Sequence, residues 1–252
     1  MDFIKDDDAL ILYKRYDNMM NNLYYGLVEH TKFLTPYEKK MVISLANKYK
    51  LYYQVFESHT NSERDAVYFS TDPFELEAYI YQDFAAVQIR KVNDKMDHKN
   101  VLGALMGLGI ERETVGDIVF GDDNIEISVT SEMADYIVFN LDSIGRNRVK
   151  PSLKDDVFLE EVKLEYKTSQ IIVSSLRLDV VVAGLINLSR SNSKKMIQME
   201  RIKVNHQVES NPSVELDTKD TISIHKHGRF IIGNILGRTR KDKIRLEIKE
   251  VK

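Results

Sequence analysis

The middle of the chain alternates strand-like and helix-like patterns, and this alternation limits the folds that the sequence can adopt. Runs rich in β-branched residues predict strands, and apolar residues that recur every three or four positions predict helices. In order, the segments are "AAVQIRKV", "HKNVLGALMGL", "GDIVF", "NIEISVT", "SEMADYIVFNLDSI" (a helix expected to end at Gly145), "RVKPSL" and "EEVKLEYK". Strand–helix–strand–strand–helix–strand predicts a ferredoxin-like, or RRM-like, α+β layer over residues 73–170.

The segment before this layer, residues 1–72, combines helix signals with a pair of strands. Apolar positions at mixed helical spacing predict a helix over residues 8–34. A second helix begins at "TPYE", where Thr35 caps, Pro36 suits the first helical position and Glu38 completes a capping box. "LYYQVFE" and "DAVYFS" then predict two strands, and "TDPFE" opens a short helix at the boundary of the next domain.

The last segment, residues 171–252, holds two short helices followed by several short strands. The helices lie in "SSLRLDVVVAGLINLSRSNSKKMI" and meet at "LSRSNS". The strands lie in "RIKVNHQVE", "DTISIHKHGRF", "IIGNIL" and "KIRLEIKEV". We therefore expect an α+β protein of three domains, 1–72, 73–170 and 171–252, of which the last is a small α+β module.

Charge is unevenly divided along the chain, although the net charge of the whole is only −3. Residues 171–252 hold 16 Lys and Arg against 9 Asp and Glu, a net of +7. The remaining 20 against 30 give residues 1–170 a net of −10. A basic C-terminal part suggests a polyanionic partner. Independent drift of solubility in two domains is the alternative explanation.

Composition also restricts the chemistry and the expected location. The chain has no cysteine, so disulfides, thiolate metal sites and thiol nucleophiles are excluded. The acidic start "MDFIKDDDAL" does not resemble a secretory signal, and no apolar stretch approaches the roughly 20 residues of a membrane span. We expect a soluble cytoplasmic protein with no membrane partner.

Several motifs invite a catalytic, nucleotide or metal site, and none fits one. Gly103, Gly107 and Gly109 lack the spacing of a nucleotide loop, and we interpret them as small residues that let a helix pack closely on a sheet. For "DHK" (97–99) we favour helix capping or local hydrogen bonding over an acid–base or RNA-contacting role, because no nucleophile stands at a recognisable spacing. His225 and His227 share one strand face without a third ligand. We predict no catalytic residue, no cofactor and no metal site.

The second of the two C-terminal helices begins with cations where acidic residues are favoured. Ser189 or Ser191 caps it, and Arg190, Lys194 and Lys195 follow. Free amides with clustered cations suit a phosphate group, although a solvated basic face is the alternative. The candidate RNA-binding residues are Arg177, Ser189, Arg190, Ser191, Lys194, Lys195, Lys203, Lys226 and Arg229.

The C-terminal motifs together resemble a known RNA-binding domain. "RLDVVVAGLINLSRSNSKKMIQ", "RIKVNH" and "DTISIHKHGRF" are similar to the domain named after small-ribosomal-subunit protein four, also called the αL motif. Its elements "RLD", "SRS" and "KVN" occur in order, and "KDTISI" takes the place of "GD-I-S". Glu200 is a departure, because the motif commonly has glycine there. The match implies RNA contacts at Arg177, Ser189, Arg190, Lys194 and Lys195.

A motif in the middle of the chain indicates which family with this RNA-binding domain the protein resembles. "DHKNVLGALMGLGIERETVGDIVF" is similar to the middle-domain signature of the YlmH family, bacterial proteins that carry this RNA-binding module at the C-terminus. In that family an Arg-Asp pair usually follows His98, whereas this chain has Lys99 and Asn100, so no catalytic role is carried over. The resemblance implies a translation-linked factor. It would act on the large ribosomal subunit carrying peptidyl-tRNA, in rescue of stalled nascent chains, and its gene would usually lie near division genes.

These observations lead to one favoured function and two alternatives. We expect a non-catalytic monomer that binds ribosomal RNA and tRNA on the large ribosomal subunit. No aromatic residue lies between Ser174 and Asn205, so recognition of the shape and phosphates of folded RNA is favoured over base stacking. The alternatives are an RNA-modifying enzyme of the pseudouridine synthase kind, and a cell-division interaction protein that binds RNA secondarily.

Overall fold

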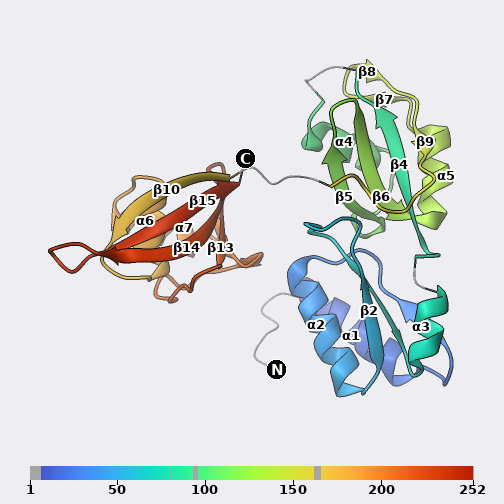
Figure 1. Cartoon of the computed structure of the whole chain (residues 1–252), viewed down its shortest axis with the longest axis horizontal. Coiled ribbons are helices and arrows are strands. Elements are labelled where there is room, and N and C mark those ends of the chain that lie inside the picture. Colours follow the sequence, from blue (N-terminus) through green and yellow to red (C-terminus); the bar gives the residue numbers. More distant parts are fainter. Residues whose placement is uncertain (1–6, 80, 93–95, 162–165, 252) are drawn as a thin grey trace. The chain divides into compact units, whose positions relative to one another are not determined.

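The computed structural model describes residues 7–79, 81–92, 96–161 and 166–251. The chain divides into two compact units, Met1–Val162 and Lys163–Lys252, and each combines helices with antiparallel sheets (Figure 1). This confirms the predicted α+β class. The three-domain division stays a prediction. Within the described ranges, no helix is long and apolar enough to cross a membrane.

The first part of the first unit packs helices on both faces of one central strand. Its elements are α1 (Asp7–Asn21), β1 (Val28–His30), α2 (Pro36–Lys48), β2 (Tyr52–Phe56), β3 (Ala66–Ser70) and α3 (Pro73–Tyr79), and the strand order is β1-β3-β2. Strand side chains alternate between faces. Val67 and Phe69 therefore join the α1–α2 core, while Ala66 and Tyr68 face a second cluster that contains Phe84. Both faces of β3 are buried, as its unbroken apolar run suggests.

Two helix predictions for this part had different outcomes. The capping box is confirmed: the Glu38 amide donates to the Thr35 hydroxyl, and the Thr35 amide donates to the Glu38 carboxylate at 2.6 Å. The helix predicted over residues 8–34 is wrong beyond Asn21. The chain turns there and forms β1, whose Glu29 pairs with Phe69 of β3. Pairing with a distant strand thus overrides the local helical spacing.

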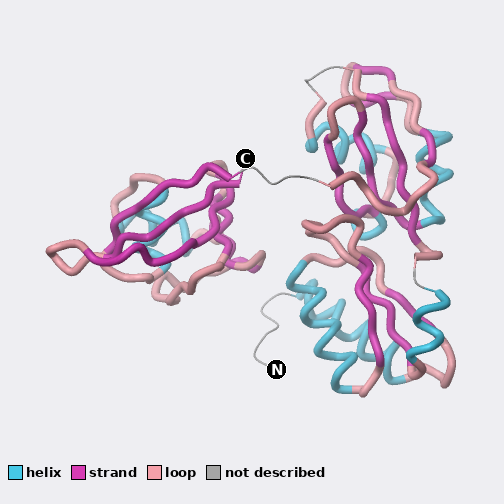
Figure 2. The backbone as a smooth tube through the Cα atoms, viewed as in Figure 1, coloured by secondary structure: helices cyan, strands magenta, loops and turns pink. Residues whose placement is uncertain are grey.

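The second part of the first unit follows the predicted order of strands and helices. Its elements are β4 (Phe84–Arg90), α4 (His98–Gly107), a 3-10 turn η1 (Arg112–Thr114), β5 (Val115–Phe120), β6 (Asn124–Thr130), α5 (Ser131–Asn140), β7 (Ser143–Ile144), β8 (Asn147–Arg148) and β9 (Ser152–Leu153). The antiparallel sheet has the order β5-β6-β4-β9, and both helices pack on one face of it (Figure 2). Strand β9 contributes only two residue pairs, so the finer ferredoxin-like assignment stays a prediction.

The helix predicted over residues 131–144 is too long. α5 ends at Asn140, and Ser143 and Ile144 form a small hairpin with Asn147 and Arg148. Gly145 has a φ of +61°, which suits the tight turn of this hairpin rather than a helix end. Ile144 is buried in the core beneath α4 and α5, and this burial favours the hairpin.

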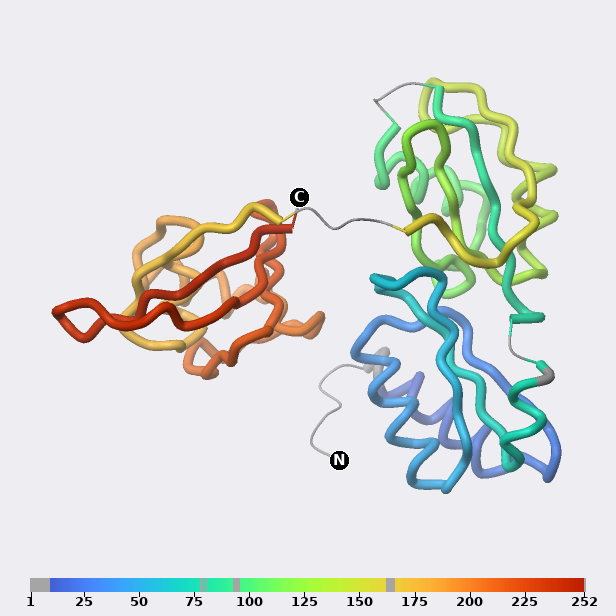
Figure 3. Tube along the Cα trace, in the orientation of Figure 1, coloured from blue at the N-terminus to red at the C-terminus, as the bar shows by residue number. Residues whose placement is uncertain are grey.

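The second unit is a six-stranded sheet with two helices on one face (Figure 3). Its elements are β10 (Tyr166–Val173), α6 (Leu178–Leu185), α7 (Arg190–Gln198), β11 (Ile202–Val204), β12 (Gln207–Val208), β13 (Thr221–Ile224), β14 (Gly228–Arg238) and β15 (Ile244–Val251). The order is β10-β15-β14-β13-β11-β12, with every neighbouring pair antiparallel. Val182 of α6 and Ile197 of α7 pack against Ile222 and Leu246 of the sheet. The predicted helix pair is confirmed.

Candidate nucleic-acid interface

The start of α6 places a carboxylate inside the protein. Arg177 is the N-cap residue of this helix, and its backbone pairs with Glu215 in an isolated β-bridge. The amides of the next two residues donate to the carbonyls of Val214 and Pro212, at 2.8 and 3.1 Å. These bonds hold the first turn against the loop that precedes β13. The side chain of Asp179, in this first turn, is completely buried.

Three cations converge on this buried carboxylate. The Arg177 guanidinium donates to both Asp179 oxygens, at 3.1 and 3.3 Å. The Arg190 Nε, from the first turn of α7, donates to Asp179 Oδ2 at 2.8 Å. The Lys194 Nζ lies 3.9 Å from the same oxygen. We call these four residues the Asp179 cluster. It gathers cations from both helices around one anion.

One serine hydroxyl joins the two helices, and another caps α7. The buried Ser193 hydroxyl, on α7, donates to the Asp179 backbone carbonyl at 2.8 Å. Ser189 is the N-cap of α7, and its hydroxyl accepts from the Asn192 amide at 3.2 Å. Ser189 rather than Ser191 therefore caps the helix, which decides between the two predicted candidates. Together these bonds fix where α7 begins relative to α6.

The Asp179 cluster carries excess positive charge at the surface. Burial raises the pKa of the Asp179 carboxyl, but hydrogen bonds from Arg177 and Arg190 outweigh it and hold the pKa below its usual value. The carboxylate is therefore ionised and offsets one of the three cations. The side chains of Arg177, Arg190 and Lys194 remain 32%, 52% and 46% exposed. Their remaining N–H groups are oriented by a fixed internal anion and can donate outward, an arrangement that suits phosphate oxygens.

The other predicted residues lie on several elements of the same unit. Ser191 and Lys195 are exposed on α7. Lys203 is exposed on β11, Lys226 lies in the turn between β13 and β14, and Arg229 lies on β14. Of the nine predicted residues, the structure brings Arg177, Arg190 and Lys194 together around Asp179. An RNA contact at any of the nine stays a proposal.

Sequence reasoning missed Asp179 and Ser193, although both stand inside the quoted motifs. A carboxylate in the first turn of a helix is common, because it interacts favourably with the helix amides. Nothing local shows that this one is buried beneath two arginines. The available signal for Ser193 was its spacing, because it stands four residues before Ile197 and therefore on the same, buried face of α7.

Glu200 replaces a commonly found glycine without losing the glycine conformation. Its φ is +58°, in the left-handed region that ends many helices. The Glu200 amide donates to the Ile197 carbonyl at 2.9 Å, directly after α7. The departure from the motif therefore leaves the end of α7 with a left-handed turn.

The "DHK" segment begins α4 in the first unit. Asp97 is the N-cap residue, and its carboxylate accepts from the Asn100 amide at 2.8 Å, which confirms the capping interpretation. Partial desolvation and the neighbouring charge of Arg112 lower the pKa of His98 from 6.5. His98 is therefore mostly neutral at pH 7.

The packing interpretation of the α4 glycines is wrong. A Cβ atom placed on Gly103 or Gly107 would meet no other atom within 4 Å, and both residues are exposed. They face away from the sheet because Val101 and Leu105 occupy the buried side of the helix.

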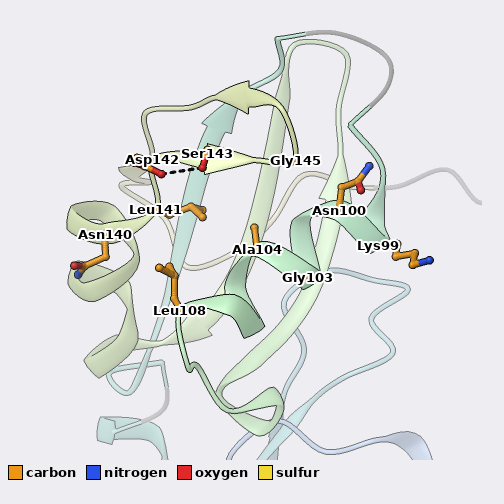
Figure 4. Close-up of a pocket in the computed structure, with 10 residues that line it drawn as sticks. All are labelled: Lys99, Asn100, Gly103, Ala104, Leu108, Asn140, Leu141, Asp142, Ser143 and Gly145. Carbon is orange, nitrogen blue, oxygen red and sulfur yellow. Dashed lines mark hydrogen bonds between the residues drawn. The ribbon is translucent and has the colours of Figure 1, made fainter.

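A pocket of about 450 Å³ lies beside α4. Figure 4 shows Ala104, Leu108 and Leu141 along it, together with the hydrogen bond from Ser143 to Asp142 at 2.8 Å. It also includes Lys99, so its charged groups are of mixed sign. This arrangement offers neither a nucleophile with a base nor a cluster of like charge.

The remaining motifs lie at the surface. His225 and His227 are exposed. The sequence also has three pairs of adjacent acidic residues, at positions 122–123, 155–156 and 160–161, and these are exposed as well. Across the part of the chain that the structure describes, no group of three or more His, Asp or Glu side chains could hold a metal ion.

Comparison with known proteins assigns the two RNA-related segments. Residues 77–156 match the family model for the candidate RNA-binding domain in YlmH, and residues 176–222 match the S4 domain, which includes the Asp179 cluster. The chain carries a YlmH-type domain followed by an S4 domain. These matches confirm the resemblance to the YlmH family.

The chain is also similar to two known proteins. The chain is 35% identical, over 159 residues, to the "Ribosome-associated protein quality control protein P2" of Bacillus subtilis. The matched residues cover 62% of this chain and 61% of that protein. The chain thus matches less than two thirds of that relative. The solved structure of "Cell division protein ylmH from Streptococcus pneumoniae" is 22% identical, with a TM-score of 0.48, over 60% of this chain and 92% of that one. A similarity this low carries no argument about function.

Proposed function

We propose that this protein binds structured ribosomal RNA and tRNA through its S4 domain and catalyses no reaction. We further propose that it acts on large ribosomal subunits that carry peptidyl-tRNA, during quality control of stalled nascent chains. The name of the Bacillus subtilis relative supports a ribosome-associated role. The observation that carries the proposal is the convergence of Arg177, Arg190 and Lys194 on the buried carboxylate of Asp179.

The geometry of the Asp179 cluster favours folded RNA over other polyanions. Two guanidinium groups held by one carboxylate have fixed orientations, and planar guanidinium groups recognise phosphate in a bidentate manner. Pre-orientation reduces the entropy that the side chains lose on binding. The lack of aromatic residues between Ser174 and Asn205 removes a base-stacking surface. A face of this kind suits the phosphates and the shape of a folded RNA.

The test is co-sedimentation with purified large ribosomal subunits at several salt concentrations. Arg190→Ala removes an oriented cation and should lower the affinity about tenfold, with a salt slope smaller by about one. Lys167→Ala is the control, because Lys167 is 69% exposed on β10 and its removal changes the net charge equally. The control should bind as the wild type does. Unchanged binding of Arg190→Ala, or equal losses in both variants, would reject the Asp179 cluster as the binding site.

Two further measurements address the finer parts of the proposal. Puromycin releases nascent chains, so it should reduce the amount of protein that sediments with large subunits if peptidyl-tRNA is part of the binding site. The set of modified nucleotides in ribosomal and transfer RNA should be the same in a deletion strain and its parent. A missing modification would instead support the enzyme alternative.

A further inference from the structure

The end of the β14–β15 hairpin gathers cations that the Asp179 cluster does not include. We call residues 238–245 the basic tip, and its cations are Arg238, Arg240, Lys241, Lys243 and Arg245. The tip has five cations and one carboxylate, Asp242, so its net charge is +4. The S4 domain match ends at residue 222, so the tip lies outside the matched segment.

Most of this charge is left unpaired within the second unit. Arg238 Nη1 donates to Asp242 Oδ1 at 2.9 Å. The Thr239 amide donates to the Lys243 carbonyl at 2.8 Å, so backbone bonds close the turn. Arg240, Lys241 and Lys243 are exposed, and none of them forms an ion pair with a carboxylate in the described ranges. The tip therefore holds a defined turn from which three cations face solvent.

Strand β14 is bent before it reaches the tip. Its register with β15 shifts between Ile232 and Ile235 and again between Ile235 and Gly237. Each shift is an extra residue in β14, and such bulges bend a strand and increase its twist. Gly237 has a φ of +121°, which other residues rarely adopt. Figure 1 shows the loop between β14 and β15 projecting past the other strands of this unit.

The outer half of β14 adds little to the hydrophobic core. Strand β13 pairs with β14 only as far as Ile231, so β14 has no β13 neighbour beyond that point. Ile235 and Leu236 are 49% and 43% exposed. The bulges disfavour pairing with a further strand, because they break the regular spacing of backbone groups. Clustered like charges repel one another, and a polyanion on the tip would relieve that repulsion.

We propose that the basic tip is a second contact for folded RNA, which binds the phosphate backbone separately from the Asp179 cluster. This inference rests on the proposed RNA-binding function, because it adds a contact for the same partner. The tip has no aromatic residue, so base stacking is not available to it. Exposed ammonium and guanidinium groups on a projecting turn suit the phosphates of a helical segment.

The test compares two double variants with equal loss of charge. Arg240→Ala/Lys241→Ala removes two cations from the end of the tip. Lys167→Ala/Lys249→Ala removes two cations from the opposite end of the same sheet, where the start of β10 pairs with the end of β15. Binding to purified large ribosomal subunits and to deproteinised large-subunit RNA is measured across a salt series. The tip variant should bind both about tenfold more weakly, with a salt slope smaller by about two. The control should stay within about twofold of the wild type.

Each other outcome has a defined meaning. Wild-type binding by the tip variant, together with weakened binding by Arg190→Ala, would overturn the tip contact and leave the proposed function standing. The reverse result would support the tip and reject the Asp179 cluster as a site. Unchanged binding in both variants would overturn both. Equal losses of affinity in the tip variant and the control variant would show an effect of net charge only. If the tip variant lost affinity for subunits but not for deproteinised RNA, a ribosomal protein would be indicated as the partner. Either of these results would overturn the RNA contact at the tip.

Discussion

Both units contain a pair of arginines that share one oxygen acceptor, and the two pairs differ in the kind of acceptor. In the first unit, Arg64 and Arg112 both donate to the backbone carbonyl of Val115. In the second unit, Arg177 and Arg190 both donate to the Asp179 carboxylate. The acceptor is neutral in the first case and charged in the second.

The first pair is desolvated inside the protein, whereas the second pair is partly exposed to solvent. Desolvation lowers the pKa of Arg64, and desolvation together with the charge of Arg64 lowers the pKa of Arg112 to about 10. Arg64 also donates to the Phe33 carbonyl at 2.8 Å, so the first pair joins separate segments of backbone. Arg190 is 52% exposed and is held by a counter-ion. An arginine whose donors are used on carbonyls inside the protein stabilises the fold, whereas one oriented by a buried carboxylate can still bind a ligand.

The largest expected effect comes from removing the shared carboxylate. Asp179→Asn leaves Arg177 and Arg190 without a counter-ion and should destabilise the second unit by about 3 kcal/mol. Binding to large ribosomal subunits should also weaken, because the two guanidinium groups lose their fixed orientation. Chemical denaturation and co-sedimentation measure the two effects.

Asp242→Asn is the matched control for this substitution. Asp242 also pairs with an arginine, Arg238, but its side chain is 82% exposed. An exposed pair contributes about 0–1 kcal/mol, so the control should leave stability nearly unchanged. Similar effects of the two substitutions would show that burial of Asp179 does not matter.

A smaller effect is expected from breaking the pair in the first unit. Arg64→Met removes donors to the carbonyls of Phe33 and Val115 and should destabilise the first unit by about 2 kcal/mol. Affinity for large ribosomal subunits, measured on folded protein, should not change. Arg64→Lys keeps the charge but not the planar fork, so it should lose much of the same stability. If Arg64→Met lost affinity for RNA but kept the stability of the wild type, the proposed difference between the two pairs would be wrong.

Acid should weaken the second pair through Asp179. The pKa of this carboxyl is lower in the folded protein than in the unfolded chain, so its stabilising contribution is complete above about pH 4. As the pH falls below 4 and through the folded pKa, the unfolded chain binds the proton first and this contribution is lost. The free energy of unfolding of Asp179→Asn, measured from pH 6 to pH 3, should vary less than that of the wild type. An equally steep dependence in both would exclude Asp179 as its source.

The smallest expected effect concerns His98, which lies close enough to Arg112 to respond to its charge. Desolvation contributes most to the lowered pKa of His98, and Arg112 comes next. Arg112→Gln should therefore raise this pKa towards 6.5, and nuclear magnetic resonance titration of the imidazole would measure it. Since the folded pKa lies below the unfolded one, His98 reduces stability as the pH falls through 6.5. Arg190→Ala, in the other unit, should leave the titration of His98 unchanged. A shift of the His98 pKa in that variant would contradict the attribution to Arg112.

Sequence patterns predicted the elements whose signals are local. The Thr35–Glu38 capping box, the Asp97 cap and the helix pair after residue 174 all follow from residues within a few positions of one another. Errors occurred where distant contacts decided the structure. The predicted first helix ended early because β1 pairs with β3, and α5 ended early because Ile144 enters the core.

The sequence by itself determined the α+β class, the positions of most helices and the concentration of cations after residue 171. Only the tertiary structure decided which cations have partners. Arg64 meets Val115 across 51 residues, and Arg190 meets Asp179 across 11. Desolvation and hydrogen bonding depend on neighbours that the folded chain brings together from distant positions. For this reason the two arginine pairs differ in their exposure and in the charge of the acceptor that they share.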